Sequence, residues 1–392
     1  MEAVDDPRAV VGARVSMFIQ QLGRLDAGLE DAPTREVPDP RLLVRFRALV
    51  EDHRARARRL AEDVDRGLPL PECWAALRQA QGAAQPLFRE GLRFIQGAMA
   101  RASGLDGGLC RVADALLHDL SVRAVLHWDG FTVLDEGEFF GEMAKIVRLR
   151  FPDASVWDLP VAAHEFGHFV AQELRVQRGD GAYRYPVQEL LAREPPGSHA
   201  WWALQEHFAD AFATFAVGPA YAAACLLLRF DPSRASEPPG PGSRHPAAGP
   251  RAATILRVLR EMDRAEGELV RAYGPIVQRL EEAWRASEAS ARDGSEAPAA
   301  APSGRTDADR LYEVLRVSLA DVRYDGWPRV PSLAADLAGD ADLARTARVA
   351  PGYRIADVLN AAWLWRAEKP RPPGEVVRVG GRALALCRQL AA

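Results

Sequence analysis

The segment that most constrains this chain is the octapeptide 161–168, which reads Val-Ala-Ala-His-Glu-Phe-Gly-His. It contains the pattern His-Glu-x-x-His. On an α-helix, His164 and His168 lie four residues apart and project from one face, so two imidazoles can share one metal ion. Glu165 is offset around the helix and can reach a metal-activated water rather than the metal. The spacing therefore predicts a helix that offers two Zn²⁺ ligands and a general base.

Residues around the motif predict that this helix is buried on its far side. Asp158 and Pro160 precede the motif, as an N-cap and a first-turn proline do. Phe166, Phe169 and Val170 fall opposite the two histidines. The alternative is a surface helix with two solvated histidines, and these apolar neighbours disfavour it.

A third ligand is expected downstream, because a catalytic zinc usually takes three protein ligands and leaves one position open. Glu206 and Asp210 are again four residues apart, with Phe208 and Phe212 on the opposite face. Glu206 is the candidate third ligand. Asp210, one turn further on, is placed to accept a hydrogen bond from the free ring nitrogen of a zinc-bound histidine. The alternative for both carboxylates is a solvated helix face.

These motifs resemble those of the gluzincin metallopeptidases, with the closest likeness to the HtpX and CAAX prenyl endopeptidase family. His-Glu-x-x-His at 164–168 is followed by Glu-x-x-Ala-Asp at 206–210, and then by a His-Pro dipeptide at 245–246 and Arg251. The resemblance covers about residues 150–260. It implies a zincin-like catalytic core in which His245 and Arg251 help to bind substrate and stabilise the tetrahedral intermediate. The family's usual members are embedded in membranes, whereas this chain has no clear spanning segment.

The expected chemistry is peptide hydrolysis. Zn²⁺ would acidify its water and polarise the scissile carbonyl, Glu165 would act as general base, and His245 or Arg251 would donate to the developing oxyanion. Tyr183, Tyr185 and Tyr221 are other possible donors, although such residues more often serve packing. The expected protein is a bacterial intracellular protease with a restricted protein or peptide substrate.

Two alternatives stay open at this point. In the first, the zincin-like core is a catalytically silent, zinc-stabilised regulatory or protein-binding module. The presence of Glu165 disfavours it, because a purely structural site needs no general base. In the second, the chain is a tightly regulated bacterial stress or conflict-system protease with one cognate target, which differs in substrate range rather than in chemistry.

Composition limits the partners and the compartment. The net charge of −4 provides no basic field for nucleic acid. The four cysteines are far apart and form no CxxC pair, which indicates reduced thiols in a cytoplasmic protein. No secretory signal is evident at the acidic N-terminus. Lysine occurs only at positions 145 and 369, and this preference for arginine, with abundant Ala, Gly and Pro, is typical of GC-rich bacterial genomes.

One segment has the length of a membrane span, because the 18 residues 211–228 carry no charge. Gly218-Pro219 interrupts it in the middle. We therefore expect two buried helices joined at a Gly-Pro turn, and no stable insertion into a membrane.

The expected fold is mainly α, of the α+β type, with a zincin-like core, a small antiparallel or mixed sheet, and helical regions at both ends. Helical spacing predicts an N-terminal region at 1–120, interrupted near 38–40, 68–71 and 104–108. The metallopeptidase core is expected at 121–285, a flexible linker or loop at 286–306, and C-terminal helices at 307–392. The core should contain strands at 122–128, 131–134 and 145–151. The last of these precedes the His-Glu-x-x-His helix, as does the substrate-binding edge strand of a zincin.

Overall fold

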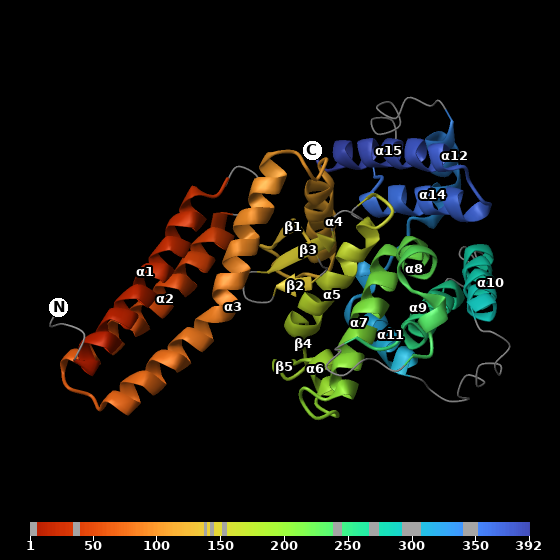
Figure 1. Cartoon of the computed structure of the whole chain (residues 1–392). Coiled ribbons are helices and arrows are strands. Elements are labelled where there is room, and N and C mark those ends of the chain that lie inside the picture. Colours follow the sequence, from red (N-terminus) through yellow and green to blue (C-terminus); the bar gives the residue numbers. More distant parts are fainter. Residues whose placement is uncertain are drawn as a thin grey trace. The chain divides into compact units, whose positions relative to one another are not determined.

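The computed structural model describes residues 6–33, 40–136, 139–141, 145–150, 155–237, 245–265, 274–291, 307–339 and 352–392. These residues form mainly α-helices with a few short strands (Figure 1), which confirms the mainly α fold class. The chain divides into two compact units. One comprises Met1–Gly107 and Asp129–Arg148, and the other comprises Gly108–Trp128 and Leu149–Ala392. The division expected from the sequence, with boundaries at 120, 285 and 306, stays a prediction.

Three long helices build the first unit: α1 (Pro7–Asp31), α2 (Pro40–Asp65) and α3 (Leu70–Ala102). They run alongside one another in Figure 1, and the expected interruptions near 38–40 and 68–71 fall between them. Their apolar residues recur at helical spacing and meet in one core that includes Phe18, Phe46 and Phe94.

The first unit also holds most of a three-stranded sheet, whose strands are β1 (Phe131–Asp135), β2 (Phe139–Gly141) and β3 (Ile146–Arg150), in the order β1-β3-β2. The pairing of β2 with β3 is antiparallel. The expectation that β3 is an edge strand is wrong, because it has a partner on each side. The side chain of Arg148 on β3 is only 2% exposed and pairs with Glu90 and Asp135.

The strand expected at 122–128 is also wrong. Helix α4 (Leu109–Arg123) includes Val122, and the chain then turns through Val125, which has a φ of +53°. Val122 is 62% exposed, while Leu116 and Leu120 on the same helix are buried. The buried face stabilises the helix, and this packing outweighs the β-propensity of the valines.

Helices dominate the second unit, and most of them surround α7, which packs against α5, α9 and α11. The longer helices of this unit, besides α4, are α5 (Ala162–Glu173), α7 (His199–Val217), α9 (Ala248–Ala265), α10 (Gly274–Ala291), α11 (Asp307–Ser318), α12 (Val330–Ala338), α14 (Ile355–Glu368) and α15 (Pro373–Leu390). The shorter elements are η2 (Leu159–Val161), the antiparallel strands β4 (Val176–Gln177) and β5 (Tyr183–Arg184), α6 (Pro186–Leu191), α8 (Pro219–Ala224), the π-helix η3 (Cys225–Arg229), η4 (Pro232–Arg234), η5 (Ala320–Val322) and η6 (Trp327–Arg329).

The expected Gly-Pro turn is confirmed, because α7 ends at Val217 and α8 begins at Pro219. Within the described part of the chain, no helix combines the length and apolar character that crossing a bilayer requires. Residues 286–291 of the expected linker are helical, since α10 extends to Ala291, and residues 292–306 lie outside the described residues.

Candidate metal centre

The candidate centre lies between α5 and α7, two helices that approach each other closely. A Cβ added at Gly167 would lie 2.9 Å from the Cα of Ala209, so only glycine fits at this crossing. Phe166 and Phe212 add a ring contact between the same helices. Ser198 caps α7 by accepting a hydrogen bond from the backbone N–H of Trp201. These features fix the two helices that carry the polar residues described next.

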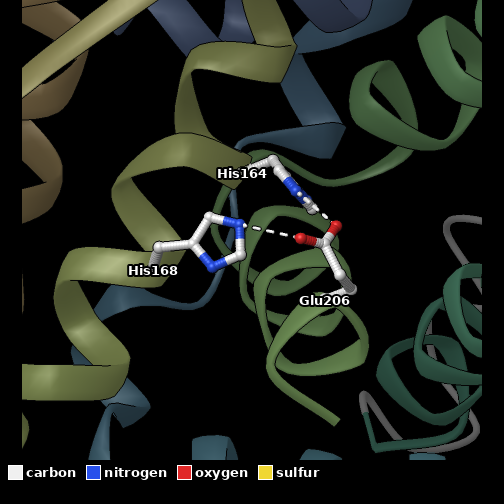
Figure 2. A group of neighbouring side chains, drawn as sticks. All are labelled: His164, His168 and Glu206. Atoms are coloured by element: carbon white, nitrogen blue, oxygen red, sulfur yellow. Dashed lines mark ion pairs between the residues drawn. The ribbon is translucent and has the colours of Figure 1, made fainter. Parts of the chain in front are cut away.

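The two histidines of α5 and Glu206 of α7 converge on one point. Figure 2 shows both imidazoles turned toward the carboxylate of Glu206. The Nε2 atom of His164 lies 3.4 Å from Glu206 Oε2, and the Nε2 atom of His168 lies 3.5 Å from Glu206 Oε1. One ligand atom from each residue lies within 4.8 Å of the other two. The group is buried and could bind a metal ion.

The carboxylate of Glu206 supplies an independent reason to expect a cation. Its Oε2 atom is buried and receives no hydrogen bond, although three nitrogens lie 3.0–3.6 Å away. A buried charged oxygen without a hydrogen bond is costly, and a bound cation removes that cost. Two imidazoles and one carboxylate are also a ligand set that suits zinc. The residues present therefore fit a metal ion.

Behind the ligands, Asp210 joins three side chains into one network. It accepts two hydrogen bonds from Arg251, from Nε to Oδ2 and from the NH2 nitrogen to Oδ1, each of 2.8 Å. It also accepts one of 2.6 Å from the hydroxyl of Tyr221. Its Oδ1 atom lies 3.0 Å from Nδ1 of His164. Asp210 thus lies where the sequence placed it, beside the ring nitrogen of His164 that faces away from Glu206.

These contacts favour one tautomer of a neutral His164. Its Nδ1 faces only acceptors, because Tyr221 donates its own proton to Asp210 and so presents lone pairs to the imidazole, 3.1 Å away. In a neutral His164 these acceptors favour a proton on Nδ1, and the Nε2 lone pair is then left for a metal.

Electrostatics keep the carboxylates of this network charged. Burial alone would raise the pKa of Asp210, but Arg251 holds that pKa well below its usual range. Burial likewise acts to raise the pKa of Glu206, and the imidazoles of His164 and His245 lower it. Burial lowers the pKa of His168 to about 4. Burial also acts to lower the pKa of His164, but Asp210 and Glu206 outweigh it and raise that pKa to about 10. A metal ion therefore competes with a proton at His164.

The structure also brings His245 and Arg251 to this place. The Nδ1 atom of His245 lies 3.0 Å from Glu206 Oε2, and its side chain is 65% exposed. Arg251 lies on α9 with its guanidinium over the ring of Phe230, and its remaining NH1 nitrogen is 3.6 Å from Glu206 Oε2. Its Nε and NH2 nitrogens bind Asp210, and the NH2 nitrogen also lies 3.5 Å from Nε2 of His164. Arg251 therefore contacts the candidate ligands as well as the carboxylate that supports them. Ser243 and Arg244, which precede His245 in the sequence, lie outside the described residues.

The partial exposure of two histidines gives the site an open side. His168 has 16% of its side chain exposed, whereas Glu206 has 8% and His164 has 5%. Glu165 is buried on the same helix, with 6% of its surface exposed. The candidate centre is therefore accessible from the side of His168 and His245.

Searches with this chain find no matching family model, no matching curated protein and no matching solved structure.

Sequence reasoning missed the role of Tyr221, which is fully buried on α8 and bound to Asp210. Its hydroxyl is one of the few polar groups in the uncharged run 211–228, and that isolation was the available signal. Tyr183 and Tyr185, the other candidate donors, are 51% and 42% exposed, and neither forms a hydrogen bond with a candidate ligand among the described residues.

Proposed function

We propose that this protein is a zinc-dependent peptidase of the gluzincin type, with a protein or peptide substrate. The observation that carries the proposal is the convergence of His164, His168 and Glu206 from two helices, with Asp210 beside His164. A zinc ion held by these three residues would supply Lewis-acid chemistry, by polarising a carbonyl and acidifying water. The resemblance of the motifs to the HtpX and CAAX prenyl endopeptidase family supports the same reaction.

The chain's own residues divide the remaining work. Glu165 accepts a proton from the attacking water and delivers it to the leaving amine. His245, exposed beside Glu206, donates to the oxygen that becomes negative during attack. Arg251 holds Asp210 and keeps that carboxylate charged. We further propose a bacterial, cytoplasmic enzyme with a restricted substrate.

The test separates metal binding from chemistry. Purified wild-type protein should carry about one zinc per chain, and Glu206→Ala should lose most of it. Glu165→Gln should keep the zinc and abolish cleavage, measured by metal analysis and proteomic cleavage profiling. Glu173→Gln, an exposed position on the same helix, is the matched control and should keep both properties.

The zinc and cleavage measurements can contradict the proposal in different ways. Full zinc retention in Glu206→Ala would place the third ligand elsewhere, and hydrolysis by Glu165→Gln would remove the general-base assignment. A protein that binds zinc but cleaves nothing in either form would instead be the silent regulatory or protein-binding module.

A further inference from the structure

Tyr221 occupies an unusual position for a buried tyrosine, because its hydroxyl touches both a ligand and that ligand's support. It donates to Asp210 Oδ1 at 2.6 Å and lies 3.1 Å from His164 Nδ1. Its ring is nearly parallel to the imidazole of His164, with an interplanar angle of 11° and centroids 6.2 Å apart. The side chain is fully buried, so it cannot reach a substrate. Its contacts limit the rotation of the His164 ring.

The placement of Tyr221 depends on the corner between α7 and α8. Gly218 forms this corner with φ +78° and ψ −150°, a conformation essentially reserved for glycine. Without support, a bend of this kind would let α8 swing relative to α7. Asp210 lies on α7 and Tyr221 on α8, so the length of their hydrogen bond depends on the corner.

Asn360 of α14 braces this corner. Its Nδ2 donates to the carbonyl of Val217, the last residue of α7, at 2.6 Å. Its Oδ1 accepts from the backbone N–H of Ala220, which precedes Tyr221, at 2.9 Å. Asn360 is itself fully buried and is anchored by a further bond to the carbonyl of Ala356. One amide therefore bridges both sides of the bend.

We propose that Tyr221 is a positioning residue that fixes His164 for metal binding, and that Asn360 holds Tyr221 in place. The inference rests on the metal site of the proposed function but not on peptidase activity. It also assigns a role to the C-terminal helix α14. Asn360 of this helix binds Ala220, beside Tyr221, although the two residues are 140 positions apart in the sequence.

The first test is Tyr221→Phe, which removes one oxygen and keeps the ring. Loss of a partner that supports a metal ligand typically weakens metal binding about 10- to 100-fold. We expect a loss in that range for zinc, measured by competition with a chelator. The ¹H shift of the Nδ1–H proton of zinc-bound His164 should also change, because the Tyr221 oxygen that lies 3.1 Å from Nδ1 is removed.

Tyr312→Phe is the matched control. Tyr312 lies in the same unit, is 7% exposed, and donates its hydroxyl to the carbonyl of Glu261. Its loss should affect stability without changing zinc affinity. Equal zinc affinities of wild type and Tyr221→Phe would overturn the inference and leave the metal site standing. A wild-type protein without zinc affinity would overturn both.

The second test asks whether Asn360 acts through Tyr221. Asn360→Ala should weaken zinc binding, and the double variant with Tyr221→Phe should bind about as weakly as Tyr221→Phe alone. Losses that multiply would show that Asn360 acts by another route and would remove it from the proposal. Should Asn360→Ala fail to fold, Asn360→Asp, which keeps the acceptor for Ala220 and loses the donor to Val217, is expected to give the same non-additive loss.

Discussion

Asp210 is the residue around which the polar groups of the centre are arranged. Arg251 and Tyr221 donate to it, and His164 lies beside it, so three helices besides its own contribute to one carboxylate. The carboxylate stays charged because Arg251 compensates for burial. At this scale the centre is a shared hydrogen-bond network rather than three independent ligands.

Gly167 offers a prediction at the residue scale. In Gly167→Ala the new methyl group would meet the backbone of Ala209, so α5 and α7 must separate. Overpacking of this kind costs about 1–3 kcal/mol of stability, and separation of the ligand-bearing helices should also weaken zinc binding. Urea unfolding and chelator competition measure the two effects.

Gly381→Ala is the control for this substitution. Gly381 lies within α15, and an added Cβ meets no atom within 4 Å. The control should be neutral or should gain up to about 1 kcal/mol from helix propensity. A Gly167→Ala variant as stable as this control would contradict the close approach of the two helices.

At the scale of elements, the corner between α7 and α8 decides where the uncharged run 211–228 goes. The bend at Gly218 turns one apolar segment into two buried helices, and Tyr324 packs against the glycine from the other side. The backbone N–H of Tyr324 also donates to the carbonyl of Phe215 at 2.8 Å. The C-terminal helical region thereby closes over the turn.

Gly218→Ala should therefore be destabilising for two reasons. The backbone conformation is strained for any side chain, at about 1–3 kcal/mol, and the new Cβ would lie 2.6 Å from the ring of Tyr324. The free energy of unfolding from urea titration should fall by at least that amount. An unchanged midpoint would mean that the chain adopts another bend there.

At the scale of the whole molecule, the chain builds two units that each have a core. The three long helices supply the first, and the helices around α7 supply the second. All four cysteines are free and buried, with Cys73 in the first unit and Cys110, Cys225 and Cys387 in the second. The rate at which these thiols react with a thiol reagent therefore measures how often each unit opens.

These thiols should be nearly inert in the native protein. Burial raises the pKa of Cys225 to about 12 and also raises the pKa of Cys387. The reactive thiolates of these two residues are thus scarce as well as shielded, and Cys73 and Cys110 are shielded by burial. A thiol reagent at pH 8 should label the native chain slowly and reach four thiols after denaturation. Ser103→Cys, at an exposed position, should add one fast-reacting thiol. Rapid labelling of the native wild type would contradict the burial.

The sequence by itself determined the mainly helical fold, the breaks between the long N-terminal helices, the Gly-Pro turn and the residues that gather at the centre. These features depend on residues that are close in sequence, such as prolines and the four-residue spacings of His164/His168 and Glu206/Asp210. A helix therefore places such residues on one face whatever the rest of the chain does. Strand order, the burial of Arg148, and the roles of Tyr221 and Asn360 were decided only by the tertiary structure. They depend on which distant segments meet, as when Asn360 bonds to Val217 and Ala220. The spacing of residues within one helix or strand does not determine such long-range contacts.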